Sequence, residues 1–138
     1  SKQNEQGYAT EQLISQVIEG VLVKINNHSL KSFTHYPLNL LVTEIDGLNQ
    51  REREYVKHVW SHVDFVIVNT LTKEPVLVIE VDGTVHDRKV QKTLDRNELY
   101  ISAGIKLIVL NIADIKFANK TIFEVIDTEM TRVTCAKH

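Results

Sequence analysis

The stretch that decides the fold reads VDFVIV at residues 63–68 and VLVIEVDGTVH at residues 76–86. Both runs are rich in β-branched residues, which favour strands. The segment between them, NTLTKEP at residues 69–75, is polar and contains a proline, as is typical of a turn. The sequence therefore predicts an antiparallel hairpin.

Asp64, Glu80 and Asp82 are three carboxylates on the two predicted strands of this hairpin. Side chains alternate between the faces of a strand, so Glu80 and Asp82 share one face, with Cα atoms roughly 7 Å apart. A register that pairs even-numbered residues with each other adds Asp64 to this face, opposite Glu80 or Asp82, whereas an odd register points Asp64 away. Three neighbouring carboxylates repel one another, and a bound divalent cation removes that conflict.

The oxygen-preferring ions Mg²⁺ and Mn²⁺ suit such a cluster better than zinc does, with water and substrate phosphate completing the metal shell. Gly83 allows a turn after the strand, where His86 can face the same site. In the alternative interpretation, Asp64 and Asp82 end their strands in solvent and Asp82-Gly83 is a simple turn. That alternative leaves Glu80, an acidic residue inside an apolar run, without an explanation.

The order and spacing of these residues resemble the PD-(D/E)XK nuclease superfamily. The likeness rests on Asp64, on EVDGTVH at residues 80–86, and on the helix and strand expected after them, and it extends from about residue 5 to residue 111. It is closest to the branch similar to very-short-patch-repair endonucleases, which includes small domains of unknown function often fused to helicases. The resemblance implies a restriction-endonuclease-like α/β core, in which a mixed central sheet is flanked by helices.

The resemblance also implies an activity, the metal-dependent hydrolysis of phosphodiester bonds in DNA, with RNA not excluded. Asp64 and Glu80 would hold Mg²⁺ or Mn²⁺, and Asp82 would complete or extend the metal shell. Asp82 stands where better-known members carry a lysine, so His86 becomes the candidate for orienting or deprotonating the attacking water. Glu11 matches a glutamate that the family places on its first helix, as an outer-shell or second-metal ligand.

Other interpretations stay open because the superfamily includes inactive members. The chain could be a non-catalytic nucleic-acid-binding or docking module of a larger, helicase-like protein, or a structural or protein-interaction domain. Asn111 follows the last predicted core strand, where related domains frequently have an arginine. For a nuclease, loss of Asp64 is expected to abolish cleavage and to leave the fold intact or more stable, because a repulsive charge is removed. Related nucleases often act as dimers.

The net charge of −2 does not by itself indicate nucleic-acid binding, which normally shows as a basic excess. Basic residues are nevertheless grouped locally, and a stripe of them beside the acidic site could hold a phosphate backbone. A solvated helix face is the alternative interpretation of each group. The group before the hairpin is Arg51, Arg53 and Lys57, and the predicted nucleic-acid-binding group after it is Arg88, Lys89, Lys92 and Arg96.

Apolar spacing and turn residues predict the remaining elements. A helix capped by Thr10 buries Leu13, Ile14, Val17, Ile18 and Val21; a strand spans 36–42, a turn 46–47 and a helix about 50–60. A further helix is predicted over about 87–103, with Val90, Leu94, Asn97 and Ile101 along one side. Gly104 ends this helix, and a buried strand follows it. Residues 122–130 are predicted to form a helix or an edge strand.

Composition places further limits. With 138 residues, 43% of them hydrophobic, the chain suits a single domain over residues 1–138, and the missing initiating methionine suggests a segment of a larger protein. The sequence contains no membrane-length apolar run and nothing resembling a signal peptide. A lone Cys135 favours a reducing cytoplasm. His58 and His62 are spaced for a helical zinc pair, but they lack the glutamate of a His-Glu-x-x-His motif.

Overall fold

The computed structural model describes residues 2–43, 45–58, 61–82, 98–111 and 120–135, with the backbone alone for residues 2–9 and 82. Residues 98–102 form a short helical segment without a label. The labelled elements are α1 (Lys2–Ile25), β1 (Leu30–Pro37), α2 (Leu38–Leu41), α3 (Gln50–Lys57), β2 (His62–Asn69), β3 (Glu74–Asp82), β4 (Leu107–Asn111) and α6 (Ile122–Cys135).

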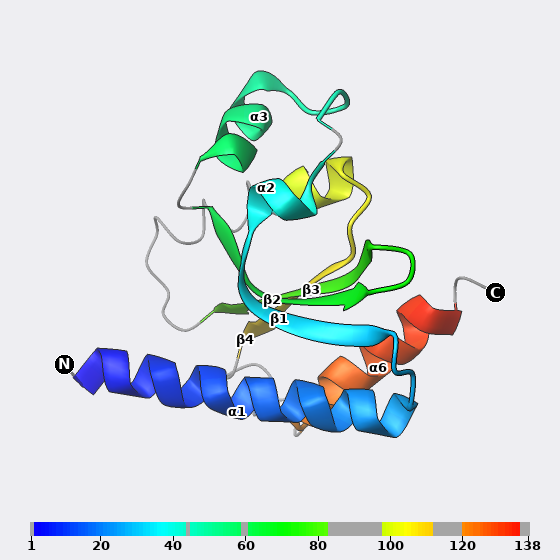
Figure 1. Ribbon diagram of the computed structural model, residues 1–138. Helices are drawn as coiled ribbons and strands as arrows, with labels where there is room; N and C mark the ends of the chain where they lie inside the picture. The colour runs from blue at the N-terminus through cyan, green and yellow to red at the C-terminus, as the bar shows by residue number, and fades with distance from the viewer. Residues whose placement is uncertain (1, 44, 59–60, 83–97, 112–119, 136–138) are drawn as a thin grey trace.

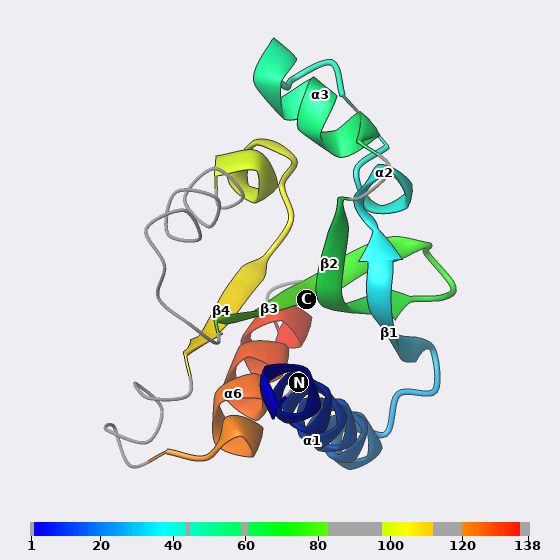
Figure 2. The same ribbon diagram turned by 90° about the vertical axis from the view of Figure 1, so that its left-hand side faces the viewer.

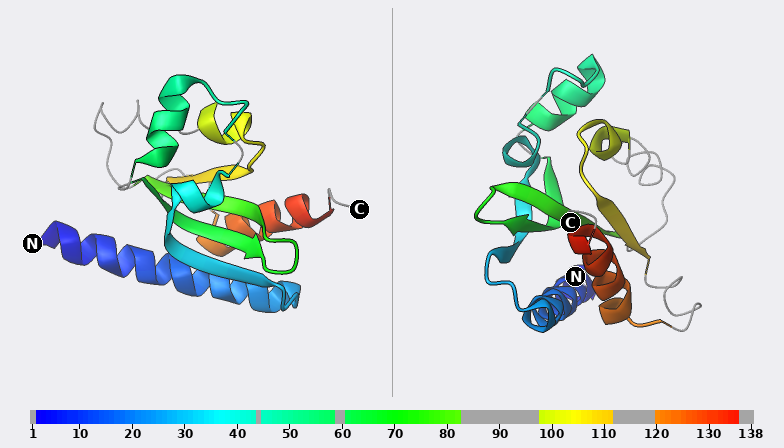
Figure 3. Two further views of the ribbon diagram at one scale, coloured as in Figure 1. Left: turned by 45° about the horizontal axis from the view of Figure 1, so that its top comes forward. Right: turned by 90° about the vertical axis from the view of Figure 1, so that its right-hand side faces the viewer.

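The strands form one mixed sheet in the order β1-β2-β3-β4. The pairs β1–β2 and β2–β3 are antiparallel, whereas β3–β4 is parallel. Helices α1 and α6 cover one face of the sheet, and α2, α3 and the 98–102 segment lie on the other (Figures 1 and 3). This is an α/β fold with a mixed central sheet flanked by helices, which confirms the predicted fold class.

The predicted hairpin is confirmed as β2 and β3, joined by a turn in which Asn69 pairs with Glu74. The amide oxygen of Asn69 accepts hydrogen bonds from the backbone N–H groups of Leu71 and Thr72 at 3.0 and 3.3 Å, so this side chain shapes the turn. The register shifts between Ile67 and Val68, and from Phe65 to Ile67 it is even to even, with Val66 opposite Val78. Continued by one residue beyond the last pair, Phe65 with Ile79, this register would place Asp64 opposite Glu80.

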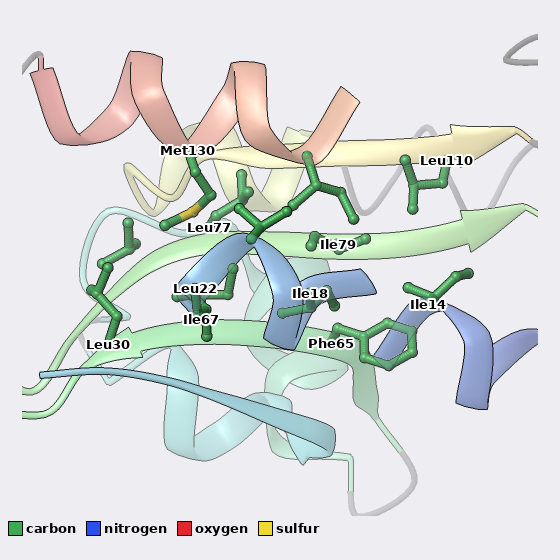
Figure 4. Packing of buried hydrophobic residues seen from close by; sticks show 13 residues of the cluster. Ile14, Ile18, Leu22, Leu30, Phe65, Ile67, Leu77, Ile79, Leu110 and Met130 are labelled. Carbon is green, nitrogen blue, oxygen red and sulfur yellow. The ribbon is translucent and has the colours of Figure 1, made fainter. Parts of the chain in front are cut away.

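The larger hydrophobic cluster lies between the sheet and the helices α1 and α6 (Figure 4). Ile14 and Ile18 of α1 are fully buried against the sheet, as predicted, but Leu13 is 52% exposed. The helix begins at Lys2 rather than near Thr10, so the predicted cap at Thr10 is wrong. Polar residues occupy the first two turns of α1, so the apolar repeat that predicted the helix does not extend to its actual start.

A second cluster on the opposite face corrects the predicted strand over 36–42. β1 already ends at Pro37, and the next residues form the single helical turn α2. Leu38 and Leu41 are both buried in this cluster, and Leu38 donates its backbone N–H to the carbonyl of Ser61 at 2.8 Å. A short apolar run suits a buried helical turn as well as a strand, and tertiary contacts decided between them here.

The helix expected over about 50–60 is confirmed as α3 from Gln50 to Lys57, and the turn at 46–47 is also present. The carboxyl-terminal segment is a helix, α6, which settles the choice left open for residues 122–130. Figure 3 shows α6 beside α1, and the ammonium of Lys24 on α1 binds the carboxylate of Asp127 on α6 at 2.6 Å.

The helix predicted over 87–103 is described only at residues 98–102, so Val90, Leu94 and Asn97 lie outside the described residues. Within 98–102, the side chain of Ile101, which the sequence placed along one side of the helix, is 77% exposed, whereas Leu99 and Tyr100 are buried. The exposed side of the segment therefore includes an apolar residue of the predicted helical repeat.

Gly104 ends this helix as predicted, with a left-handed φ of 71° that suits glycine. The strand that follows is β4, in which Leu110 is fully buried but Val109 is 36% exposed, so the expected buried strand is only partly buried. Among the described residues, no helix combines the length and the apolar character needed to cross a membrane.

Candidate functional site

The strands β2 and β3 separate at Asp64. Their last pair at this end is Phe65 with Ile79, and only a continuation of the same register by one residue would place Asp64 opposite Glu80. Phe65 packs in the cluster under α1, whereas Val63 packs in the cluster on the other face, so the alternation of side chains is interrupted between them. Figure 2 shows the beginning of β2 rising away from β3. The candidate site lies where these strands diverge.

Asp64 is held against β3 by a hydrogen bond to the backbone. Its Oδ2 atom accepts from the N–H of Val81 at 2.9 Å, in a half-buried position. In a continuing antiparallel ladder, a backbone carbonyl of β2 would accept from such an N–H group. The carboxylate of Asp64 takes that place beyond the last strand pair, next to the residue that carries the second carboxylate.

Glu80 is the second carboxylate, and it is 8% exposed inside the apolar strand β3. Its Oε1 atom accepts a hydrogen bond from the hydroxyl of Tyr100 at 3.2 Å, and Tyr100 itself is 1% exposed. Burying an ionised carboxylate costs free energy unless polar partners stabilise it. A buried glutamate with a dedicated hydroxyl donor is thus a specific feature of this end of the sheet, and sequence analysis missed the donor.

The remaining predicted ligands and bases are only partly described. The backbone of Asp82 pairs with Asn111 at the common end of β3 and β4, and the side chain of Asp82 lies outside the described part of the chain. The same is true of the predicted water-activating residue His86. The predicted nucleic-acid-binding residues Arg88, Lys89, Lys92 and Arg96 also lie outside the described residues.

Glu11 lies near this end of the sheet but one strand away. Its Oε2 atom is 3.1 Å from the Nε2 atom of His35 on β1. The β1–β2 register places His35 opposite Asp64, and His35 has a positive φ of 49°, which is uncommon for a residue other than glycine. None of the described contacts joins Glu11 to Asp64 or Glu80. Nothing in the sequence indicated a role for His35, because the identity of one histidine does not reveal its backbone conformation.

The donor set fits a hard divalent cation. Asp64 and Glu80 supply carboxylate oxygens, the ligands that Mg²⁺ prefers. A carboxylate has about four lone-pair positions, so accepting one hydrogen bond is compatible with binding a metal ion. Among the described residues, no group of three or more histidine, cysteine or acidic side chains could hold a metal ion. The third predicted ligand is Asp82, whose side chain is not described.

Two other predicted features have different roles. The guanidinium of Arg53 donates to the backbone carbonyls of Ile45, Leu48 and Asp46 at 3.1, 3.0 and 3.3 Å, so it braces the turn before α3 rather than presenting a basic surface. His58 and His62 do not form a helical pair, in line with the low weight that a zinc site had from the sequence, because His58 caps the end of α3 in an extended conformation and His62 begins β2.

A half-open pocket of about 550 Å³ lies at the opposite end of β3, away from the carboxylates. Its lining includes Glu74, Pro75 and Lys106, with apolar side chains around them. The lining contains neither Asp64 nor Glu80, so the pocket and the carboxylate pair are separate features of the described structure.

A family model described as a protein of unknown function, DUF2726, matches residues 9–128. The chain belongs to the DUF2726 family. The part that matches DUF2726 includes every strand of the sheet and the residues Asp64, Glu80 and Tyr100. Comparison of the chain with curated proteins and with solved structures gives no significant match.

Proposed function

We propose that this DUF2726 domain is a metal-dependent nuclease that hydrolyses phosphodiester bonds in DNA. The observation that carries the proposal is the buried Glu80 within an apolar strand, next to Val81, whose backbone N–H binds the carboxylate of Asp64 where β2 and β3 diverge. Two carboxylates that are each held by a hydrogen bond form a preorganised set of oxygen donors. The order of strands and helices is compatible with the nuclease core that the sequence resembles.

In this proposal, Asp64 and Glu80 hold Mg²⁺ or Mn²⁺, and Asp82 completes or extends the metal shell. When bound, the ion makes hydroxide available near neutral pH and neutralises the charge that develops on the phosphate. Asp64 and Glu80 keep their oxygens oriented through Val81 and Tyr100. His86 orients the attacking water and takes its proton. Glu11 acts as an outer-shell or second-metal ligand.

The nucleic acid would be held by the basic residues that follow β3, which are Arg88, Lys89, Lys92 and Arg96. Each phosphate contact made by a lysine or arginine releases counterions, so binding to DNA should weaken steeply as salt increases. Cys135 is a free and exposed thiol, which suits the proposed cytoplasmic location. Fusion to, or association with, a helicase-like protein is part of the proposal, and a dimer is one candidate for the oligomeric state, which the proposal does not fix.

The first experiment is a calorimetric titration of the purified domain with Mg²⁺ and Mn²⁺. Asp64→Asn and Glu80→Gln are the informative variants, because an amide oxygen can still accept the hydrogen bonds from Val81 and Tyr100 while the negative charge is lost. Asp46→Asn is the matched control, since Asp46 lies in an exposed turn and contributes only its backbone carbonyl to a described hydrogen bond. We expect both site variants to lose metal binding and the control to retain it.

A nuclease assay follows on plasmid DNA, single-stranded DNA and RNA with each metal. The wild-type domain and Asp46→Asn should cleave DNA, whereas Asp64→Asn and Glu80→Gln should not. Full metal-dependent cleavage by either site variant would show that the assignment is wrong. DNA binding that is indifferent to Mg²⁺, with no cleavage under any metal, would instead support the non-catalytic nucleic-acid-binding module.

A further inference from the structure

We infer that Tyr100 is a positioning residue, whose hydroxyl fixes the orientation of Glu80 and thereby sets the affinity of the site for its divalent cation. This inference rests on the proposed function, because it assumes that Glu80 is a metal ligand. It adds a residue from a helix that the carboxylate pattern does not include. The contact that supports it is the 3.2 Å hydrogen bond from the Tyr100 hydroxyl to Oε1 of Glu80, which is buried.

The ring of Tyr100 is held rigidly. It is 1% exposed and belongs to the hydrophobic cluster that includes Val66 and Val78 of the sheet. The end of its helix is closed by Gly104, and the backbone carbonyl of Tyr100 accepts a hydrogen bond from the N–H of Ile105 at 2.8 Å. Since both the ring and the backbone are fixed, the hydroxyl is a donor with a fixed position.

Glu80, the acceptor of this hydrogen bond, is connected to the same part of the fold as Tyr100. Glu80 pairs with Val109 across the parallel strands β3 and β4, and β4 follows the Tyr100 helix directly in the chain. Val78 donates its backbone N–H to the carbonyl of Lys106 at 2.9 Å, which joins β3 to the residue just before β4. The helix end, the turn and β4 thus form one framework that positions Tyr100 over β3.

A positioning role and a purely structural role of Tyr100 predict different effects of removing its hydroxyl. A hydroxyl that donates to one carboxylate oxygen restricts rotation of the carboxylate and so lowers the entropy lost when the carboxylate binds a metal ion. Partners of this kind typically change metal affinity or activity by about 10- to 100-fold when they are removed. If Tyr100 served only to fill the hydrophobic cluster, its phenylalanine variant would keep that packing and would bind metal normally.

The test compares Tyr100→Phe with Tyr36→Phe in the full chain. Tyr36 packs against the same cluster and contacts the ring of Phe33, with ring centroids 5.6 Å apart, and its hydroxyl makes no hydrogen bond among the described residues. It is therefore a matched control for removal of a tyrosine hydroxyl. Mg²⁺ binding is measured by calorimetry, and cleavage rates are measured as a function of Mg²⁺ concentration.

We expect Tyr100→Phe to raise the Mg²⁺ concentration at half-saturation by about 10- to 100-fold in both measurements. The cleavage rate at saturating Mg²⁺ should stay within about threefold of the wild-type rate, because the variant affects a ligand and not the reacting atoms. Tyr36→Phe should match the wild type. A Tyr100→Phe variant whose half-saturation lies within twofold of the wild-type value would overturn the inference.

A spectroscopic measurement covers the case in which Tyr100→Phe does not fold. The chain contains four tyrosines, Tyr8, Tyr36, Tyr55 and Tyr100, so tyrosine labelled with ¹³C at Cζ gives few NMR signals. Phenylalanine variants of the other three assign the Tyr100 signal by elimination. Its chemical shift should follow Mg²⁺ addition with the calorimetric midpoint, and a signal that does not move while metal binds would refute the positioning role.

The two proposals fail in different ways. If the wild-type domain binds neither Mg²⁺ nor Mn²⁺ and cleaves no substrate, the nuclease proposal fails and the role of Tyr100 fails with it. If Asp64→Asn and Glu80→Gln abolish metal binding but Tyr100→Phe leaves it unchanged, the metal site stands and only the positioning role is lost.

Discussion

The carboxylate of Asp64 and the backbone N–H of Val81 are joined by a 2.9 Å hydrogen bond where β2 and β3 separate. The Asp64 side chain thus replaces a backbone carbonyl of β2 as the hydrogen-bond acceptor. Because of this replacement, β2 and β3 can separate here while the N–H of Val81 keeps a hydrogen-bond partner. The same carboxylate is a candidate metal ligand. Asp64 therefore contributes to the stability of the fold as well as to the proposed chemistry.

This dual role changes the expected stability of Asp64 variants. Loss of the charge alone was expected to leave the fold intact or more stable, but Asp64→Ala also leaves the Val81 N–H without its acceptor, at a cost of about 1–3 kcal/mol. Asp64→Asn keeps an acceptor oxygen and should stay within about 1 kcal/mol of the wild type. Urea unfolding without metal measures both variants. Equal stability of the two would mean that this hydrogen bond contributes nothing measurable.

Metal binding should stabilise the folded domain. An ion that binds only the native state at about 100 times its dissociation constant adds about 2.7 kcal/mol to the free energy of unfolding. Thermal unfolding with Mg²⁺ and with excess EDTA tests this, and the midpoint should rise only with Mg²⁺. In Glu80→Gln the Mg²⁺-dependent rise should disappear, and its persistence there would place the ion elsewhere in the molecule.

Replacement of Arg53 by lysine should destabilise the domain by about 1–2 kcal/mol, because an ammonium cannot reproduce the guanidinium contacts to three backbone carbonyls. Arg132→Lys is the control, since Arg132 is exposed and pairs with Glu129, an arrangement that lysine can largely retain. The free energies of unfolding of the two variants are compared by chemical denaturation.

Arg53→Lys should leave DNA affinity unchanged. A loss of DNA affinity in Arg53→Lys alone would show that Arg53 contacts nucleic acid after all.

The capping box of α3 gives a further stability prediction. The side chain of Asn49 accepts from the backbone N–H of Glu52 at 2.8 Å, and the Glu52 side chain accepts from the N–H of Asn49 at 2.9 Å. Asn49→Ala should cost about 1 kcal/mol and lower the melting temperature by about 3–5 °C. Asn39→Ala, at an exposed position in α2, should change it little. Similar shifts in the two variants would argue against the cap.

Much of the architecture could be predicted from local sequence patterns. The β-branched runs and the polar segment between them predicted the β2–β3 hairpin, and the position of Gly104 predicted the end of the helix before β4. Prediction failed where the pattern was ambiguous or ended early. Residues 38–41 are apolar enough for a strand but pack as a helical turn, and Ile101 follows the helical repeat but is exposed because Leu99 and Tyr100 are buried.

At the candidate site, too, some residues could be predicted from the sequence and others could not. The acidic residues Asp64, Glu80 and Asp82 were apparent from the sequence because charge inside or beside an apolar strand is conspicuous. Their partners were not apparent, since Val81 acts through its backbone and Tyr100 is 20 residues away from Glu80 in the chain. A contact over such a separation depends on how the strands and the helix pack.

The sequence by itself determined the α/β class, the hairpin and the presence of acidic residues at its end, because these depend on local side-chain chemistry and alternation. The tertiary structure decided which register was used, where β2 leaves β3, and which residues hold the two carboxylates. Those outcomes depend on packing on both faces of the sheet at once. Local sequence cannot specify such packing, because the residues that meet there come from distant parts of the chain.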